Sequence, residues 1–345
     1  MTDSAAGPGP AAVFEEQRGR LFGLAYRLLG SVSDAEDILQ DTFLRWDAAD
    51  RDAIRNPAAW LTRVVTNLCL TELTSARQRR ERYTGTWLPE PVLTGAGGGG
   101  ADAGTAGLGP LETVAQRESV SMALLLLCEQ LSPPERAVFI LHEAFGYAYR
   151  EIGELLDRSE AACRQLGHRA AGRLRAEPRP ARFTPPDPAE AARWRQLTSE
   201  FLAAAVAGDL AGLERVLADD VVSFSDGGGE VPAALHPVHG RAKVARVFAA
   251  FGPALRPGTE LSPALAKALN GVLEKGLSVS QAEVNGAPAM LLWAGDDLFG
   301  LFIPVVDGRK IVALYGITAP AKLAAAARQA RLSGSRSRNA GLPGR

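Results

Sequence analysis

The sequence has little that would support metal, disulfide or membrane chemistry. Its three cysteines, Cys69, Cys128 and Cys163, are an odd number in apolar helical surroundings, and their spacing fits no metal-ligand pattern. The longest apolar run, at residues 122–128, is too short to cross a bilayer, and the first residues lack the features of a signal peptide. We therefore expect a soluble, cytoplasmic protein with no membrane partner, no metal and no other cofactor.

The chain also has almost no net charge, since its 38 basic and 39 acidic residues leave a formal charge of −1. An even distribution would argue against a nucleic-acid partner, but the distribution is uneven. Residues 31–50 contain six acids and one arginine, residues 51–83 seven arginines and three acids, and residues 158–182 seven arginines and two acids. These blocks carry net charges of 1 − 6 = −5, 7 − 3 = +4 and 7 − 2 = +5, so two basic segments remain candidates for DNA binding.

Length, periodicity and turn residues predict a multidomain protein. A chain of 345 residues with 46% hydrophobic residues can bury two or three cores. Apolar residues at helical spacing predict two all-α modules, at residues 14–83 and 111–177, joined by a flexible glycine-rich linker at 84–110. A hinge at 178–190 precedes an α+β domain at 191–320, in which helices come before a curved antiparallel sheet. We expect residues 1–13 and the basic tail 321–345 to be disordered.

Residues 149–175 have the pattern of a helix-turn-helix, with the turn at residues 157–159. Cys163, Leu166, Ala170 and Leu174 recur at helical spacing and would pack inward. The opposite face would present Arg164, Gln165 and His168 to base edges in the major groove, and Arg169 and Arg173 to phosphates. The alternative is a solvated basic face in an ordinary helical bundle. Gly167 and Gly172 each cost about 1 kcal/mol in a helix interior relative to alanine.

The first module combines an aromatic residue and an asparagine with a basic helix end. Such a face, at Trp60, Arg63, Asn67 and the following arginines 77, 79 and 80, suits melted DNA, whose unstacked bases need pockets and whose phosphates need cations. For Trp60 the alternative is core packing. The acidic helix at residues 34–46 cannot face DNA, so we expect it to bind a basic protein surface; a solvated face is the alternative.

Four motifs in this order resemble regions 2 and 4 of an extracytoplasmic-function sigma factor. They are residues 34–46, 57–67, 131–139 and 149–170. The resemblance implies that bacterial core RNA polymerase and promoter DNA are the partners. The acidic helix would bind the β′ clamp helices through Asp34, Glu36, Asp37, Gln40, Asp41, Phe43 and Trp46. The −10 element would be read by Trp60, Arg63, Asn67, Arg77, Arg79 and Arg80. The second module would contact the β flap and read the −35 element through Ser159, Arg164, Gln165, His168, Arg169 and Arg173.

Two further segments are similar to signatures of sigma factors with a SnoaL-like C-terminal extension. They are the WLPEP segment at residues 87–91 and the DGGGE segment at residues 226–230, and residues 318–323 resemble a third, degenerate signature. The resemblance implies that the extension regulates the sigma modules in cis through Trp87, Pro89, Glu90, Pro91, Asp226, Gly227, Gly228, Gly229 and Glu230. The chain departs from the subgroup at Glu230, which replaces a lysine, and in residues 318–323, which lack the usual asparagine and aspartate.

The SnoaL-like fold also includes enzymes that use a buried carboxylate or histidine as acid and base. Asp226, His236 and His239 are the candidates for such a role, although a glycine-flanked aspartate is typical of a turn and two histidines around Pro237 are typical of a loop. We therefore predict no catalytic residue, and favour a small-molecule ligand in the domain's cavity over turnover. The competing hypotheses are a DNA-binding regulator fused to a small-molecule-binding or cyclase-like domain, and a dimeric repressor that needs no polymerase.

Overall fold

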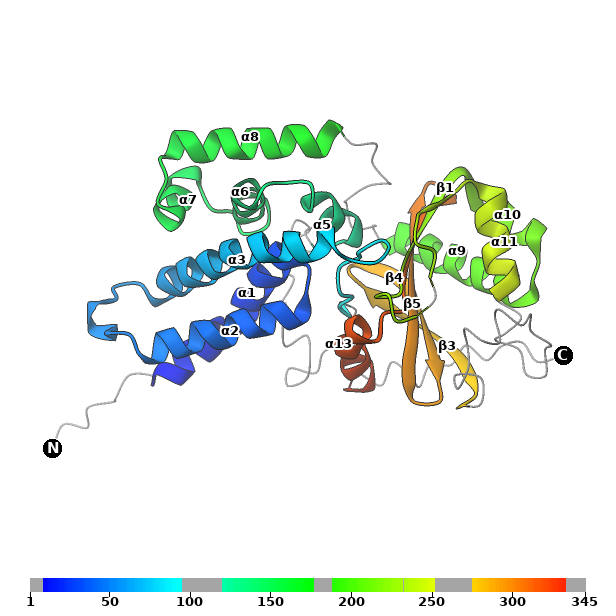
Figure 1. The fold of residues 1–345 in the computed structure, drawn as a ribbon, viewed down its shortest axis with the longest axis horizontal. Helices are drawn as coiled ribbons and strands as arrows, with labels where there is room; N and C mark the ends of the chain where they lie inside the picture. The colour runs from blue at the N-terminus through cyan, green and yellow to red at the C-terminus, as the bar shows by residue number, and fades with distance from the viewer. Residues whose placement is uncertain (1–8, 95–119, 177–187, 232, 252–274, 333–345) are drawn as a thin grey trace. The chain divides into compact units, whose positions relative to one another are not determined.

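A computed structural model describes residues 9–94, 120–176, 188–231, 233–251 and 275–332 (Figure 1). The chain divides into two compact units. The first holds α1 to α3, most of α5, and α6 to α8; the second holds residues 82–94 with α9 to α11, α13 and the sheet.

The first three long helices of the first unit are α1 (Pro10–Leu29), α2 (Val32–Asp47) and α3 (Pro57–Glu81), with a short 3-10 helix η1 at Arg51–Ala53. Gly30 ends α1 in a left-handed conformation at φ 69°, which glycine adopts without strain. The Ser31 hydroxyl accepts a hydrogen bond from the Asp34 amide at 3.1 Å, so Ser31 caps α2. Ser33, which with Glu36 also has the spacing of a capping box, lies inside the helix.

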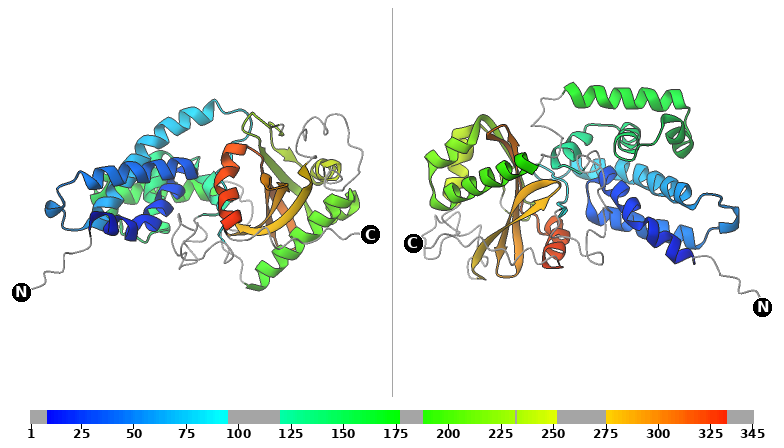
Figure 2. Two further views of the ribbon diagram at one scale, coloured as in Figure 1. Left: turned by 90° about the horizontal axis from the view of Figure 1, so that it is seen from below. Right: turned by 180° about the vertical axis from the view of Figure 1, so that it is seen from behind.

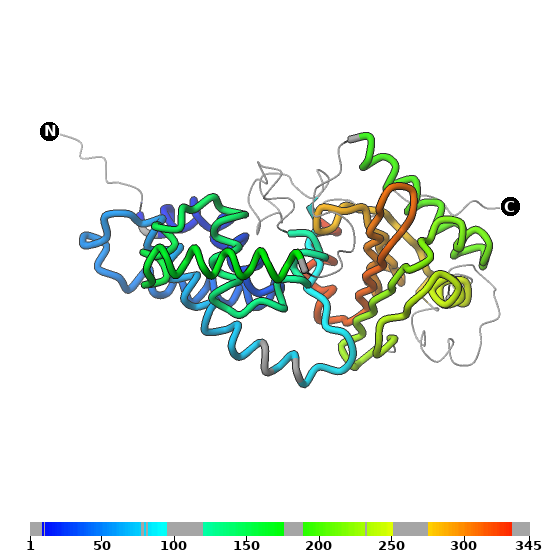
Figure 3. The backbone as a smooth tube through the Cα atoms, turned by 90° about the horizontal axis from the view of Figure 1, so that it is seen from above, coloured from blue at the N-terminus to red at the C-terminus, as the bar shows by residue number. Residues whose placement is uncertain are grey.

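The remaining helices of this unit are α5 (Met122–Cys128), α6 (Pro133–Glu143), α7 (Tyr149–Leu156) and α8 (Glu160–Ala176). A capping box starts α6, in which Glu135 Oε2 accepts hydrogen bonds from the Ser132 amide at 3.1 Å and hydroxyl at 2.7 Å. The helix α8 packs on α6 and α7, as Figures 1 and 3 show. The two modules predicted to be all-α, at residues 14–83 and 111–177, contain helices and no strand in their described residues.

The second unit begins with α9 (Pro188–Ala207) and α10 (Leu210–Val216) and continues into strand β1 (Leu217–Asp226), strand β2 (Val238–His239) and α11 (Arg241–Phe251). Four consecutive strands follow, β3 (Leu277–Val284), β4 (Ala287–Ala294), β5 (Asp297–Asp307) and β6 (Lys310–Ile317), and α13 (Pro320–Leu332) ends the described chain. The sheet order is β2-β1-β6-β5-β4-β3. Helices α9 to α11 cover one face of the sheet and α13 lies over the other (Figures 1 and 2).

The α+β prediction for this unit is confirmed, but the sheet is mixed where an antiparallel sheet was expected. Strand β1 pairs in parallel with β6, the last strand in the sequence, and the chain between them passes through β2, α11 and β3 to β5. The remaining neighbours are antiparallel. The dipeptide Asn285-Gly286, a common hairpin-turn sequence, joins β3 to β4, and both residues have positive φ, at 51° and 75°, as a tight hairpin turn requires.

The face of the sheet under α9 to α11 is filled by apolar side chains. Phe248 of α11 makes edge-to-face contacts with Phe201 of α9 and Phe302 of β5, at centroid distances of 4.9 and 5.5 Å. Beyond the sheet the structure corrects a prediction. The basic tail was expected to be disordered from residue 321, yet α13 extends to Leu332, and Lys322 within it is 8% exposed. Residues 333–345 lie outside the described part of the chain.

Candidate nucleic-acid interface and linker site

The predicted helix-turn-helix is formed by α7 and α8. Asp157 ends α7 in a left-handed conformation, and the Arg158 amide donates to the Gly153 carbonyl at 2.9 Å. A Cβ atom on Gly153 would lie 2.6 Å from the Arg158 carbonyl oxygen, so the turn requires glycine there. The residues predicted to point inward are buried, namely Cys163, Leu166, Ala170 and Leu174.

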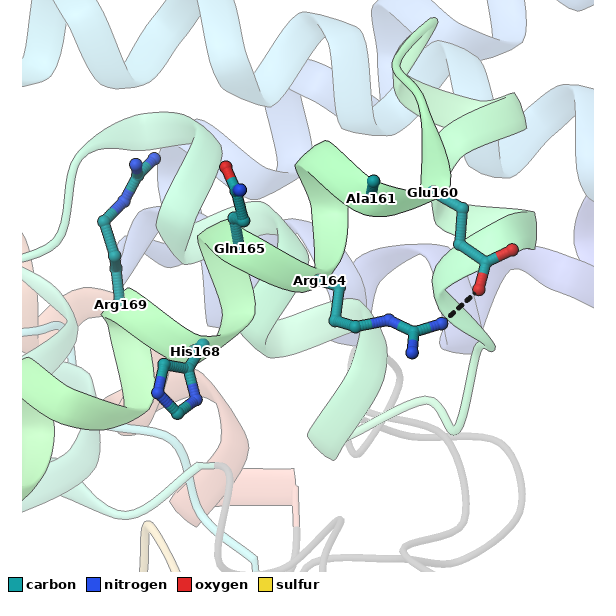
Figure 4. Close-up of a pocket in the computed structure, with 6 residues that line it drawn as sticks. All are labelled: Glu160, Ala161, Arg164, Gln165, His168 and Arg169. Atoms are coloured by element: carbon teal, nitrogen blue, oxygen red, sulfur yellow. Dashed lines mark hydrogen bonds and ion pairs between the residues drawn. The ribbon is translucent and has the colours of Figure 1, made fainter.

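The outward face of α8 carries polar side chains that line an open hollow (Figure 4). Gln165 and Arg169 point to one side of the helix and His168 to another, whereas Arg164 forms an ion pair with Glu160 one turn earlier. These four predicted DNA-binding residues are all exposed. The predicted contact Ser159 has a structural role as well, because its hydroxyl accepts a hydrogen bond from the Ala162 amide at 3.2 Å near the start of α8.

Glu135, which was not predicted as a site residue, binds both predicted phosphate contacts. Its buried carboxylate accepts from Arg169 Nε at 3.2 Å and from Arg173 Nη1 at 2.5 Å, while both arginine side chains remain more than half exposed. Burial alone would raise the pKa of Glu135, but hydrogen bonds from Ser132, the charge of Arg173 and a hydrogen bond from Arg169 outweigh burial and lower it. The position of Glu135 three residues after Ser132 fits a capping box, but that spacing does not predict the two arginine partners.

On α3 the structure separates exposed side chains from packed ones. Arg63 and Asn67, one turn apart, are exposed as a reading surface requires. Trp60 is half-buried and packs against Trp46 at a centroid distance of 5.6 Å, which supports the core-packing alternative for Trp60. Trp46 was predicted to contact polymerase and is 2% exposed, so it belongs to the core instead.

The three arginines near the end of α3 differ from one another. Arg79 is exposed and binds Glu72 at 2.5 Å and Asp34 at 3.6 Å. Arg80, predicted to contact DNA, has a side chain only 14% exposed; burial and then the nearby charge of Arg136 lower its pKa to about 9. The Arg77 side chain lies outside the described part of the structure.

Glu129, which follows α5, explains why Arg80 is buried. One carboxylate oxygen accepts from Arg80 and the other from Arg136 of α6, which is 2% exposed. Arg80 also donates to the Leu29 carbonyl at 2.5 Å. A single acid thus joins a basic residue of the first module to one of the second, within the first unit.

The acidic face predicted on α2 is present. The exposed residues are Glu36, Asp37, Gln40 and Asp41. Leu44 is also 58% exposed, which the periodicity of the sequence did not predict. Two predicted members of this surface have partners inside the unit. Asp34 is half-buried beside Arg79, and Phe43 packs edge-to-face on Phe14 at 5.1 Å.

In the second unit, Asp226 at the end of β1 collects hydrogen bonds from three parts of the chain. Its carboxylate accepts from the Tyr83 hydroxyl at 2.6 Å, the Leu88 amide at 2.8 Å and the Gly228 amide at 3.0 Å. It also binds Lys322 Nζ of α13 at 2.6 Å. The Asp226 side chain is fully buried, so its partners replace the water that a carboxylate otherwise needs.

Lys322 is the residue of the degenerate third signature that makes these contacts. Its ammonium group donates to the Leu88 carbonyl at 2.6 Å and lies 4.8 Å from the Tyr83 ring centroid and 4.5 Å from that of Trp87. Although this signature lacks the usual asparagine and aspartate, its lysine still makes these contacts. All three predicted signatures supply residues to this cluster, which we call the Asp226 cluster (Tyr83, Trp87, Leu88, Asp226 and Lys322).

The glycines after Asp226 are required by geometry. A Cβ atom on Gly227 would lie 2.1 Å from the Val231 carbonyl oxygen, and Gly228 and Gly229 have φ of 67° and 76°. Glu230, the residue that departs from the subgroup pattern, is exposed, and its amide donates to the Gly227 carbonyl at 3.1 Å.

Residues 87–94 are ordered, which corrects the prediction that the whole linker at residues 84–110 is flexible. Pro89, Glu90 and Pro91 are buried, and Leu93 forms a β-bridge with Val284. Backbone bonds continue this pairing, from the Thr94 amide to the Glu283 carbonyl and from the Asn285 amide to the Val92 carbonyl, both at 2.9 Å. The segment therefore adds a short extended piece to the β3–β4 hairpin; residues 95–110 of the predicted linker lie outside the described chain.

The residues considered for catalysis form no acid–base site within the described chain. Asp226 is enclosed by the linker, whereas His236 and His239 are exposed. No group of three potential metal ligands occurs among the described residues, and no described helix has the length and hydropathy needed to span a bilayer. Burial raises the pKa of the Cys128 thiol to about 11, and the pKa values of Cys69 and Cys163 are also raised.

Comparisons with known proteins cover both units. Residues 13–80 match the family model of sigma-70 region 2, and residues 121–174 match that of sigma-70 region 4. The chain is 39% identical over 313 residues to the ECF RNA polymerase sigma factor SigJ of Mycobacterium tuberculosis H37Rv, covering 90% of this chain and 91% of that protein. It is 35% identical over 216 residues to the probable ECF RNA polymerase sigma factor SigI of the same species, covering 63% and 69% of the two chains. The crystal structure of M. tuberculosis SigJ matches with a TM-score of 0.65 at 32% identity, covering 91% of this chain and 98% of that one.

Proposed function

Because the chain belongs to the family of extracytoplasmic-function RNA polymerase sigma factors, we propose that it acts in the cytoplasm, directing core polymerase to promoters with −10 and −35 elements. The observation that carries this proposal is the match to one such factor over 90% of the chain. An ordinary repressor would account for α8 but would have no use for the exposed acidic face of α2.

We assign reading of the −35 element to the exposed face of α8. Arginine and glutamine form paired hydrogen bonds with guanine and adenine in the major groove, and Arg164 and Gln165 are adjacent and exposed. His168 lines the same hollow of α8 as Arg169. Arg169 and Arg173 already bind Glu135, and phosphates would be their additional partners. Both of these arginines keep N–H groups beyond those that bind Glu135, because each guanidinium carries five.

We assign the −10 element to α3, through Arg63 and Asn67. Both are exposed and lie one turn apart, which suits a strand whose bases have left the helical stack. Trp60 would act indirectly, by packing on Trp46 and fixing the start of α3. Arg79 could reach a phosphate only by exchanging its acidic partners, and Arg80 only if Glu129 releases it.

We assign polymerase binding to α2 and to the second module. The exposed acids Glu36, Asp37 and Asp41 lie one to two helical turns before Leu44 on α2, and an exposed apolar residue beside charged ones is a common arrangement of a protein interface. The basic partner would be the clamp helices of the β′ subunit, and the flap of the β subunit would bind the second module. Charge complementarity would favour rapid association.

We propose that the second unit regulates the sigma modules in cis by binding the linker that joins them. The Asp226 cluster and the bonds to β3–β4 hold residues 83–94, so the length of chain left to connect the two modules depends on whether this segment is bound. The unit would act by binding and not by catalysis, because Asp226 is committed to the linker and the described face under α9 to α11 is filled. A small-molecule ligand of this domain remains the alternative to regulation by contacts alone.

Transcription in vitro tests these assignments. Bacterial core polymerase and a pool of promoter fragments would be incubated with the full chain, with an Asp226→Asn variant and with a chain ending near residue 183. Start-site-specific transcripts are expected with the full chain, and none, together with no binding to core polymerase, would contradict the sigma function. A changed yield with Asp226→Asn supports regulation by the second unit, whereas equal yields from all three contradict it. The point variant is the sharper test, because truncation also exposes Leu88, Val92 and Leu93.

A further inference from the structure

Tyr149, the first residue of α7, lies against the reading face of α8. The guanidinium carbon of Arg164 is 6.0 Å from the centroid of the Tyr149 ring. The His142 ring of α6 stacks on the same tyrosine, with centroids 4.3 Å apart and ring planes 21° apart. Tyr149 therefore connects the residue predicted to read a base with the helix behind the helix-turn-helix.

Gly167 fits this arrangement. A Cβ atom at this position would lie 2.7 Å from Tyr149 Oη and 2.9 Å from Cε1, so any larger residue would displace the ring. Gly172, five residues later on α8, has nothing within 4 Å of the corresponding position. The glycine at 167, which weakens an isolated helix, thus has a packing reason that Gly172 lacks.

Arg164 is held from a second direction by Glu160. The two side chains form an ion pair across one turn of α8, and the arginine is still 66% exposed (Figure 4). An exposed ion pair alone restrains a long side chain weakly. Contact with an aromatic ring uses no N–H donor, so Tyr149 can restrain the guanidinium and leave its donors for a base.

We propose that Tyr149 is a positioning residue for promoter recognition, which sets the direction of Arg164 and so its base preference in the −35 element. The inference rests on the proposed reading of that element by α8. A bidentate contact with a base edge requires the guanidinium plane to be fixed, and restraint before binding reduces the conformational freedom lost on binding. His142 and Gly167 contribute by fixing the ring.

The test uses holoenzyme assembled from the full chain and bacterial core polymerase, with a library of promoter fragments randomised across the −35 element. Sequencing of bound fragments gives the base preference at each position. Arg164→Ala first identifies the position that depends on Arg164. Tyr149→Leu is expected to reduce the preference at that position by about five- to tenfold, a large part of what one paired base contact supplies, and to leave other positions within about twofold.

Three further variants separate positioning from a general effect on folding. Tyr149→Phe keeps the ring and should keep the preference, whereas Gly167→Ala displaces the ring and should reduce preference at the same position. In the Tyr149→Leu/Arg164→Ala double variant, the loss should be no larger than with Arg164→Ala alone. An even loss at all positions, an unchanged preference in Tyr149→Leu, or additive losses would overturn the proposal. If Arg164→Ala alters no position, the assignment of Arg164 to the −35 element fails, and the inference fails with it.

Discussion

Nζ of Lys322 lies 2.6 Å from Oδ2 of Asp226, although these residues are 96 positions apart in the chain. The Asp226 side chain is fully buried and that of Lys322 is 10% exposed, so the pair is largely removed from water. The same ammonium group binds the Leu88 carbonyl, and the same carboxylate binds the Leu88 amide. Both backbone groups of one linker residue are thereby satisfied by one ion pair.

Asp226→Asn should release the linker from the second unit. The change leaves the Lys322 charge without its carboxylate, and breaking a buried pair in this way costs about 3–5 kcal/mol. Hydrogen exchange should show faster exchange at the amides of Leu88 and Thr94, and a lower free energy of unfolding for the unit. Asp219→Asn is the matched control, because Asp219 pairs with Arg241 on the surface and is 81% exposed. Equal protection of Leu88 in both variants would contradict the role of Asp226.

Sequence singled out three segments that contribute to the Asp226 cluster, but it indicated neither Tyr83 nor the arrangement of the cluster. The WLPEP and DGGGE segments and residues 318–323 were each recognised, but a proline- and glycine-rich stretch has the composition of a flexible linker. Its order comes from partners far along the chain, such as Asn285 and Asp226, which local composition does not reveal. Helical periodicity, by contrast, is a local property, and it placed Cys163 and Leu174 inward correctly.

Charge was the least reliable guide to side-chain roles. Arg80 and Arg63 are alike in sequence terms, yet one is buried against Glu129 and the other is exposed. Glu129 and Glu135 each bind two arginines, and nothing in the sequence next to either glutamate predicts these partners. Such pairings depend on how helices cross, and single-sequence patterns contain no information about that crossing.

Glu129→Gln should make Arg80 available to nucleic acid. Neutral glutamine cannot hold two guanidinium groups as a carboxylate does, so Arg80 should exchange into solvent more readily. Affinity of the free chain for a single-stranded oligonucleotide should rise, and the logarithmic salt slope should steepen by about 0.7 for one added phosphate contact. The Glu129→Gln/Arg80→Ala double variant should lose this gain.

The control for that change is Glu154→Gln. Glu154 pairs with Arg150 on the surface of α7, and both side chains are about 70% exposed, at 69% and 73%. Its removal should leave the slope on single-stranded DNA nearly unchanged. A gain that survives Arg80→Ala would show that the added contact comes from another cation.

The Glu135 carboxylate should make the stability of the first unit depend on pH. Its pKa in the folded chain lies below the ordinary value of 4.5, so its contribution is fully present above pH 4.5 and is lost as pH falls through the lower folded value. The difference in unfolding free energy between the natural chain and Glu135→Gln should therefore shrink as pH is lowered from about 5 to 3. Denaturant titrations at several pH values measure it, and a difference that is constant with pH would contradict the assignment.

Leu44→Asp should weaken polymerase binding without unfolding α2. Leu44 is 58% exposed among the acids of that helix, so its replacement removes apolar contact area with the partner while the core stays intact. Affinity for core polymerase should fall at least about tenfold, the effect of truncating an interface residue worth about 1.4 kcal/mol, and the unfolding midpoint should change little. Leu210→Asp provides the comparison, because Leu210 is 45% exposed on α10, outside the proposed polymerase surface. If both variants bind core polymerase equally well, the apolar contact does not lie at Leu44, and the acidic side chains of α2 alone would have to account for binding.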